Sequence, residues 1–299
     1  MTDILDTFNE IFLTLGNPNI WIRLALASIL LIVLIIFSLW QNTDLEKKII
    51  WSFLRGLIQI ILLGSILLLI FGIDEIWLLY IILLFMCFFA AYTNWRSYPY
   101  PRIFTMNFIA ITLSVMIIMT FALFSSAIPN FDGIIYQPNQ TSGVSLGSYV
   151  IPVGSMVIFF SMRESGVALE RLKSDLLKSK GEIEAALALG ATPTRSIRGL
   201  LRDSFRASLV PTINRVAVLG VVTIPGLMSG MIIGGASPIE AAVYQVVVFM
   251  MLLTAAFFTS IITNYLFIKQ FFTAEDQIDL EFFNIISQKN KKKQKKRKK

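Results

Sequence analysis

Seven long apolar runs determine what this chain can fold into. They cover roughly residues 20–40, 49–71, 76–93, 104–124, 148–162, 209–234 and 241–268. A helix needs about 20 residues to cross the hydrocarbon core of a bilayer, and only the fifth run falls well short of that length. We therefore predict an all-α, polytopic membrane protein with about seven transmembrane helices, the fifth of which continues as helix beyond the membrane.

The composition agrees with this class and excludes several others. Charged residues make up 15% of the chain, whereas soluble domains contain about 25%. The chain has no histidine and a single cysteine, Cys87, which excludes an internal disulfide, a Ser-His-Asp triad and the common zinc sites. No catalytic residues and no metal ligands are assigned. A Gly-Lys-Ser/Thr phosphate loop is also missing from the sequence, so we expect no nucleotide site in this chain.

Lysine and arginine alternate between the loops on the two sides of the predicted membrane. The loop 163–206 contains nine of them, while the segments before residue 20 and at 125–147 contain none. Because positively charged loops remain in the cytosol, we predict an N-terminus outside and a C-terminus in the cytosol of a multi-pass plasma-membrane protein.

Three regions follow from these patterns. Residues 1–19 are predicted to form an amphipathic helix on the outer surface, and residues 20–270 a transmembrane permease domain with a cytosolic section at 163–208. Residues 271–299 form a cytosolic tail that ends in a polybasic run, which should attach to anionic membrane lipid rather than to nucleic acid.

The segment 182–206, which we call the coupling segment, has the pattern of a short helix bracketed by turns. Glu182 to Leu189 favours helix, Gly190 suits a C-terminal cap, and Thr192-Pro193 suits an N-cap followed by a first turn. Such a helix can dock into another protein and pass force to both neighbouring spans. It can equally be part of a basic amphipathic loop that rests on anionic headgroups.

The run EAALALGATP at 184–193 resembles the coupling segment of ABC transporter permeases, which enters a cleft of the ATPase subunit. Further motifs, in order, are similar to those of the FetB-type permeases, a bacterial family linked to iron export with plant relatives linked to aluminium tolerance. They are Arg55–Gln59, Ala168–Leu172, Pro211–Asn214, Pro225–Gly230, and Pro238 with Ala242–Gln245.

The resemblance implies a permease subunit that exports a metal ion or small solute and is not itself an enzyme. It also implies a separate cytosolic ABC ATPase that binds ATP and Mg, and we expect a homodimer. The implied ATPase-coupling residues are Glu184, Ala185, Ala186, Gly190, Ala191, Thr192 and Pro193. The chain departs from the family pattern at Phe159-Phe160, Met231 and Arg215, and by the charged pair Arg163-Glu164.

Gly226, Gly230 and Gly234 are spaced four residues apart behind Pro225, so in one helix they share a face. We interpret this face as a close packing seam of the sixth span, against either the seventh span or a second copy. Pro225 is expected to provide a place to bend. A static packing face without a transport role is the alternative.

The candidate pathway residues are polar groups in or beside the runs: Gln59, Asn214, Arg215, Tyr244 and Gln245. Structural hydrogen bonds between helices, and snorkelling of Arg215, are the alternative roles. No acidic residue lies deep in a run, which argues against a proton relay. A stand-alone facilitator or scaffold, whose basic loop binds a partner other than an ATPase, remains the second functional hypothesis.

Overall fold

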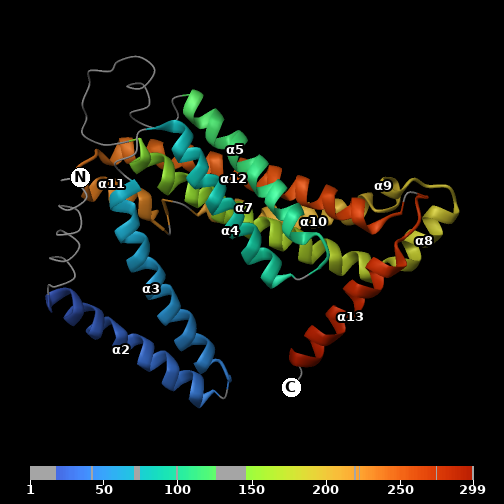
Figure 1. Ribbon diagram of the computed structural model, residues 1–299, viewed down its shortest axis with the longest axis horizontal. Helices are drawn as coiled ribbons and strands as arrows, with labels where there is room; N and C mark the ends of the chain where they lie inside the picture. Colours follow the sequence, from blue (N-terminus) through green and yellow to red (C-terminus); the bar gives the residue numbers. More distant parts are fainter. Residues whose placement is uncertain are drawn as a thin grey trace. The chain divides into compact units, whose positions relative to one another are not determined.

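The computed structural model describes residues 18–41, 43–70, 75–98, 100–125, 146–218, 220–221, 223–273 and 275–297. Every regular element in these ranges is a helix, as predicted (Figure 1). Residues 1–17, the main part of the predicted outer-surface helix, lie outside the described residues. The chain forms two compact units. One contains residues 1–74 and 145–148, and the other contains 75–144 and 149–299.

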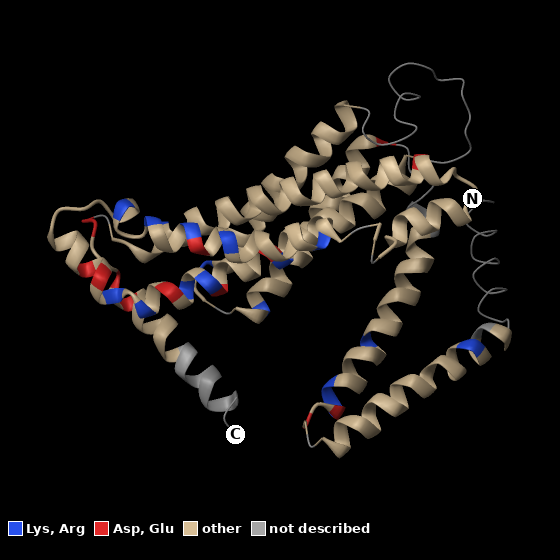
Figure 2. Cartoon of the chain, turned by 180° about the vertical axis from the view of Figure 1, so that it is seen from behind, with Lys and Arg blue, Asp and Glu red and all other residues tan. Residues whose placement is uncertain are grey.

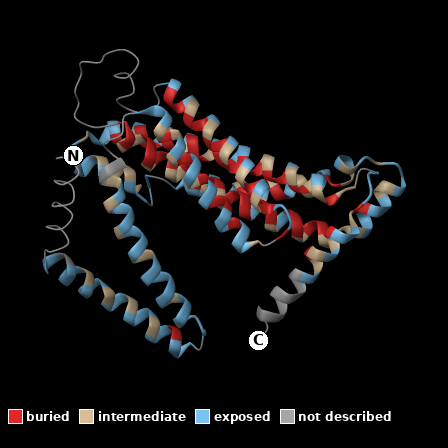
Figure 3. Ribbon diagram, in the orientation of Figure 1, coloured by how far each residue is buried: buried red, intermediate tan, exposed pale blue. Residues whose placement is uncertain are grey.

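The smaller unit is a hairpin of α2 (Pro18–Trp40) and α3 (Glu46–Ile70). The Ser38 hydroxyl donates a hydrogen bond of 2.8 Å to the Glu46 carboxylate across the turn, where Asp44 adopts a left-handed conformation. Both helices are apolar, yet 6% or less of either apolar window is buried within the chain. Figure 3 shows them exposed along their length. Lipid tails solvate such surfaces without cost, so this exposure fits membrane-spanning helices.

The larger unit is built around α4 (Ile76–Ser97), α5 (Ile103–Phe124), α7 (Gly147–Lys178) and α12 (Pro238–Phe271). Helix α5 packs against both α4 and α12, and Figure 3 shows its buried stripe. Helix α7 continues far past the predicted end of the fifth run at residue 162, as expected, and its 32 residues extend over about 48 Å. Helix α12 begins with a capping box between Ser237 and Glu240.

The remaining helices of this unit are α8 (Lys180–Ala188), α9 (Pro193–Ser196), α10 (Arg198–Ala217), α11 (Gly226–Ile233) and α13 (Leu280–Arg297). Charged side chains gather on the second half of α7, on α8 to α10 and on the α12–α13 connection, whereas α5 and the middle of α12 carry none (Figure 2). This separation is typical of a membrane-embedded part and a part in water.

Six described helices, namely α2, α3, α4, α5, α7 and α12, are long and apolar enough to cross a bilayer. The sixth predicted run, 209–234, differs from our expectation of one continuous span, because the structure divides it between α10 and α11. The helix is interrupted around Gly220, which has φ +77°, and Pro225 is the N-cap of α11. Pro225 therefore starts a new helix here and does not bend a continuous one.

An apolar core of the unit, which we call the basal cluster, lies at the charged end of the bundle. Side chains from the start of α5, the second half of α7, the end of α12, and α8 and α13 meet there. Its buried members are Tyr100, Ile103, Met106, Leu169, Leu172, Leu176, Ile183, Ile197, Phe267, Phe271, Ile278, Phe282 and Ile286. Burial of many large side chains at one end stabilises the charged part of the protein against the membrane helices.

Candidate functional site

Helix α8, in the first half of the coupling segment, is held mainly by Ile183, with Leu187 also packed against the basal cluster. Ile183 is 1% exposed and lies in the basal cluster with Phe282 and Ile286 of α13. The Lys180 ammonium lies 4.8 Å from the centroid of the Phe283 ring and pairs with Glu184 at 3.4 Å. The amphipathic pattern of α8 thus buries one edge and leaves the opposite edge free for a partner.

The exposed edge of α8 contains the predicted coupling residues. Glu184 and Ala185 are exposed, Ala186 is half-buried, and Leu189 at the end of the helix is 89% exposed. A single exposed apolar side chain is common on protein surfaces, so the exposure of Leu189 leaves it accessible to a partner without identifying one.

Gly190 ends α8 as predicted, with φ +85°. The Gly190 amide donates to the Leu187 carbonyl, and the Ala191 amide donates to the Ala186 carbonyl at 3.0 Å. This pair of bonds is a Schellman motif, which requires a left-handed residue at the glycine position. Thr192 then adopts the extended conformation of an N-cap and Pro193 opens α9, also as predicted.

A cavity of about 450 Å³ lies between the exposed edge of α8 and the α12–α13 connection. Its acidic lining residues are Glu184, Glu275 and Asp276, and its apolar ones include Leu187 and Ile278. The C-terminal end of α8 therefore lies beside this cavity.

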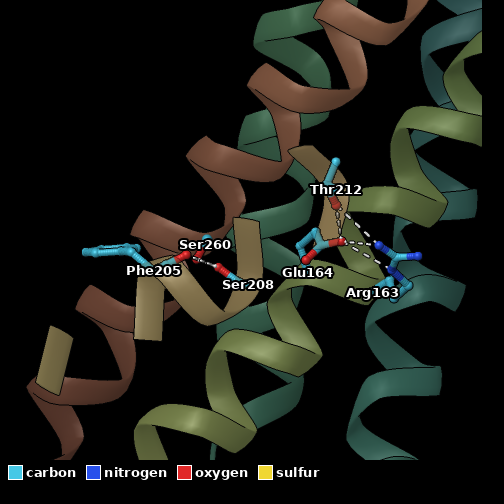
Figure 4. A network of polar contacts seen from close by, with 6 residues as sticks. All are labelled: Arg163, Glu164, Phe205, Ser208, Thr212 and Ser260. Atoms are coloured by element: carbon cyan, nitrogen blue, oxygen red, sulfur yellow. Dashed lines mark hydrogen bonds and ion pairs between the residues drawn. The ribbon is translucent and has the colours of Figure 1, made fainter. Parts of the chain in front are cut away.

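The two helices that flank the coupling segment, α7 and α10, are joined by polar contacts (Figure 4). The Glu164 carboxylate on α7 has no exposed surface, and it pairs with the guanidinium of the adjacent Arg163. The Thr212 hydroxyl on α10 donates to Glu164 at 2.7 Å. About one turn nearer the basal cluster on α7, the backbone carbonyl of Ala168 accepts a bond of 2.9 Å from the Ser204 hydroxyl of α10. Movement of one helix is therefore passed to the other.

These contacts continue into a buried polar seam that includes α5 and α12. Ser208 and Ser260 share a hydrogen bond of 2.9 Å (Figure 4), and Ser204 also donates to the Asn264 carbonyl oxygen at 3.3 Å. Ser165 of α7 donates to Asn107 of α5. Asn107 and Asn264 therefore form hydrogen bonds between helices, with α7 and α10 respectively.

Sequence reasoning missed the main feature of this seam. It placed Arg163-Glu164 just beyond a short span, at the start of the loop, whereas the structure buries Glu164 in the middle of α7. The partner Thr212 is 48 residues away, and nothing in the pattern links the two. The only signal is that Glu164 falls on the same helical stripe as Ala168 and Leu172, which are both buried.

Helix α4 is fixed to α7 at the charged end of the bundle. The Asn94 amide donates to the Met162 carbonyl at 2.9 Å. The Tyr98 hydroxyl, just beyond α4, donates to the Glu170 carboxylate at 3.2 Å. Burial, followed by the negative charge of Glu170, raises the pKa of Tyr98 to about 12, so this hydroxyl keeps its proton at physiological pH.

The candidate pathway residues differ in burial, and they belong to different units. Gln245 of α12 is buried, and its side-chain oxygen accepts a bond of 3.2 Å from the Met228 amide of α11. Tyr244 is buried beside it in the sequence. Asn214 and Arg215 are exposed near the end of α10, and Gln59 is exposed on α3 in the other unit.

The glycine face is open in the single chain. A Cβ atom added at Gly226 or Gly230 would meet nothing within 4 Å, although α11 packs against α12. Gly234 ends the helix, and a Cβ there would lie 3.3 Å from the Gly230 carbonyl oxygen. An added Cβ at Gly226 or Gly230 would thus not reach the seventh span, which is α12, within the described part of the chain.

Comparison with known proteins agrees with the motifs. The family described as "Uncharacterised protein family (UPF0014)" matches residues 21–272. The "Probable iron export permease protein FetB" of Escherichia coli is 35% identical over 85% of this chain and 93% of its own length. "Protein ALUMINUM SENSITIVE 3" of Arabidopsis thaliana is 30% identical over 88% of this chain and 91% of its own.

A third relative, "UPF0014 membrane protein STAR2" of rice, is 29% identical over 88% of this chain and 90% of its own. No solved structure matches the chain significantly. Together with the six apolar helices, these matches show a multi-pass membrane protein. The chain belongs to the UPF0014 family of membrane proteins, which includes the FetB-type permeases.

Proposed function

We propose that this chain is the membrane subunit of an ABC transporter and exports a metal ion or a small solute. A separate cytosolic ATPase would drive it by gripping the coupling segment, and would itself bind ATP and Mg. The observation that carries this proposal is the geometry of α8, which offers an exposed edge ending at Leu189 and Gly190 while Ile183 fixes its other edge in the basal cluster.

The contacts supply a route from this edge to the membrane. Force applied to α8 reaches α7 and α12 through the basal cluster, and it reaches α10 through Ser204 and Thr212. Side chains packed in a core transmit displacement because they have little free volume to absorb it. The coupling segment is thus joined to three helices at once.

The relative from Escherichia coli is named a probable iron export permease, and we extend export and the metal-ion class to this chain. Within the described residues, no cluster of three or more histidine, cysteine or acidic side chains is in position to hold a metal ion. A transported metal ion would therefore be coordinated along its path by neutral oxygen or sulfur atoms, or by a site that a second copy completes.

A homodimer is part of the proposal. The open face at Gly226 and Gly230 supports it, because small residues allow two helix backbones to approach closely in a bilayer. Association of two copies through α11 would place Gln245, which α11 contacts, near the axis between them.

Co-expression with the ATPase encoded nearest to this chain's gene tests the function. We expect the two proteins to co-purify, and the reconstituted complex to hydrolyse ATP faster than the ATPase alone. Gly190→Ala forces a residue with a side chain into a left-handed conformation, which costs about 1–2 kcal/mol of conformational free energy. It should therefore reduce the stimulation while expression stays normal.

The matched control is Gly181→Ala. Gly181 lies in α8 without a positive φ, and an added Cβ meets nothing within 4 Å, so stimulation should be unchanged. Full transport by the purified chain without any ATPase would contradict the proposal and favour a stand-alone facilitator. Equal stimulation by the Gly190→Ala and wild-type proteins would remove the coupling role of this segment.

A further inference from the structure

A shallow, open groove of about 890 Å³ follows one face of α10, and all of its lining residues belong to that helix. Three exposed arginines, Arg198, Arg202 and Arg206, line it at intervals of four residues and therefore form one stripe. The rest of its lining is mainly apolar, with Leu201, Phe205, Leu209, Val210 and Ile213. Figure 4 shows the Phe205 side chain pointing away from Glu164 and Thr212.

The basic stripe lacks an internal counter-charge. Within the described part of the chain, ion pairs join Arg163 to Glu164, Arg171 to Asp175 and Lys180 to Glu184. None of the three groove arginines takes part in an ion pair there. Three cations on one face, beside an apolar surface, are complementary to an anionic ligand that also has an apolar part.

Contacts with α12 fix the depth of the groove. Ser208 bonds to Ser260, which lies 22 positions after Pro238, the first residue of α12. Helix α12 has no charged side chain between Glu240 and Lys269, so Ser260 and Ser208 lie in the last third of its apolar stretch. Ser204 bonds to Asn264, so α10 runs from the charged end of this stretch inward. Arg206 and Arg202 then lie at headgroup level on the positively charged side, while Ile213 reaches about 10 Å deeper than Arg206.

We propose that this groove binds an anionic phospholipid of the cytosolic leaflet. The headgroup phosphate lies against Arg202 and Arg206, with Arg198 at its outer side, because guanidinium groups donate paired hydrogen bonds to phosphate oxygens. An acyl chain lies along Leu209, Val210 and Ile213. The three arginines belong to the second half of the coupling segment, on α10, whereas the proposed ATPase contact is the exposed edge of α8. Lipid binding at α10 does not depend on the proposed transport function.

Two other occupants fit the groove less well. The first is a second copy of this chain. In a symmetric dimer within one membrane, a residue near the two-fold axis faces the same residue of the other copy, so the two Arg202 side chains would repel each other at low dielectric. A water-soluble ATPase cannot cover Val210 and Ile213, which lie below the headgroups. The phospholipid alone matches both the charge at one end and the apolar surface at the other.

Native mass spectrometry of the delipidated full-length protein tests the site. The probes are a phosphatidylglycerol, a phosphatidylcholine with the same acyl chains, and glycerol 3-phosphate. We expect tight binding of phosphatidylglycerol only. The triple variant Arg198→Gln, Arg202→Gln, Arg206→Gln should bind it at least about tenfold more weakly, because each surface charge near the headgroups contributes to the attraction.

The control variant Lys48→Gln, Arg96→Gln, Lys178→Gln removes the same charge from exposed positions outside the groove and should bind like the wild type. Arg198→Lys, Arg202→Lys, Arg206→Lys should retain most of the binding. An equal loss in the control, equal affinity for phosphatidylcholine, or equal affinity for glycerol 3-phosphate would overturn the proposal. Release of bound phosphatidylglycerol when the ATPase binds would also overturn it, because the ATPase would then occupy the groove. Disulfide cross-linking of two copies of the Ile213→Cys variant would overturn it as well, because a second copy would then occupy the groove.

Discussion

The Thr212 hydroxyl of α10 donates a hydrogen bond of 2.7 Å to the Glu164 carboxylate of α7, at a point where Glu164 is fully buried. Arg163 pairs with the same carboxylate oxygen and lies within 3.3 Å of the Thr212 hydroxyl. A buried charge needs each of its partners, because loss of one leaves it poorly solvated. This relationship makes Thr212 a point of high sensitivity on α10.

Thr212→Val should destabilise the protein by about 1–3 kcal/mol, because it removes a donor from a buried charged acceptor and keeps the volume of the side chain. The midpoint of thermal unfolding in detergent, followed by tryptophan fluorescence, measures this change. Thr212→Ser keeps the hydroxyl, so it should lower the unfolding midpoint much less. Equal midpoints for Thr212→Val and the wild type would show that Arg163 alone satisfies Glu164.

The two faces of α8 should respond to mutation in opposite ways. Ile183→Ala removes a fully buried side chain and should cost about 2–5 kcal/mol of local or global stability. Leu189→Ala alters a side chain that is 89% exposed, so the unfolding midpoint should not move, while binding of the ATPase weakens. Thermal unfolding and pull-down of the ATPase separate the two effects. A Leu189→Ala protein that binds the ATPase normally would exclude the exposed edge as the docking surface.

Helices α4 and α7 meet at a glycine. A Cβ atom added at Gly154 of α7 would lie 2.4 Å from a methyl carbon of Leu83, which is itself fully buried. Gly154→Ala should therefore overpack this contact and cost about 1–3 kcal/mol, seen as a lower unfolding midpoint. At Gly64 of α3 an added Cβ meets nothing within 4 Å, so Gly64→Ala is the control and should be neutral or slightly stabilising.

The open glycine face predicts a change in assembly without a change in the fold. Gly230→Leu meets no atom within 4 Å of its Cβ in the single chain, so the monomer should keep its stability while a dimer built through α11 dissociates. Size-exclusion chromatography with light scattering in detergent reports the mass. A Gly230→Leu protein that stays dimeric would exclude this face from the interface between the two copies.

Apolar run length was sufficient to predict most of the membrane helices. The fourth run, 104–124, corresponds to α5 at Ile103–Phe124, and the third run corresponds to most of α4. The Gly190 cap was also predictable, because glycine is strongly preferred where a helix ends in a left-handed residue. These features depend on local sequence, which a single chain contains in full.

Features that depend on tertiary contacts were not predictable. The run 209–234 is mainly apolar, and the structure shows that the helix is interrupted between Gly220 and Pro225. Glu164 looked like a loop residue, because an adjacent Arg-Glu pair usually marks the end of a span. Its burial depends on Thr212. The family resemblance indicated the function but not these contacts.

The long helix α7 has a mechanical consequence. After Pro152 it runs without interruption to Lys178, and Glu164, which Thr212 holds, lies near the middle of this stretch. The second half of α7 packs in the basal cluster, and the helix is also bonded at Met162 and Ala168, so it cannot turn about Glu164 independently of its neighbours. A displacement at Lys178 would instead move α7 together with the helices of that cluster. The stiff rod would carry the same displacement to Pro152, about 39 Å away.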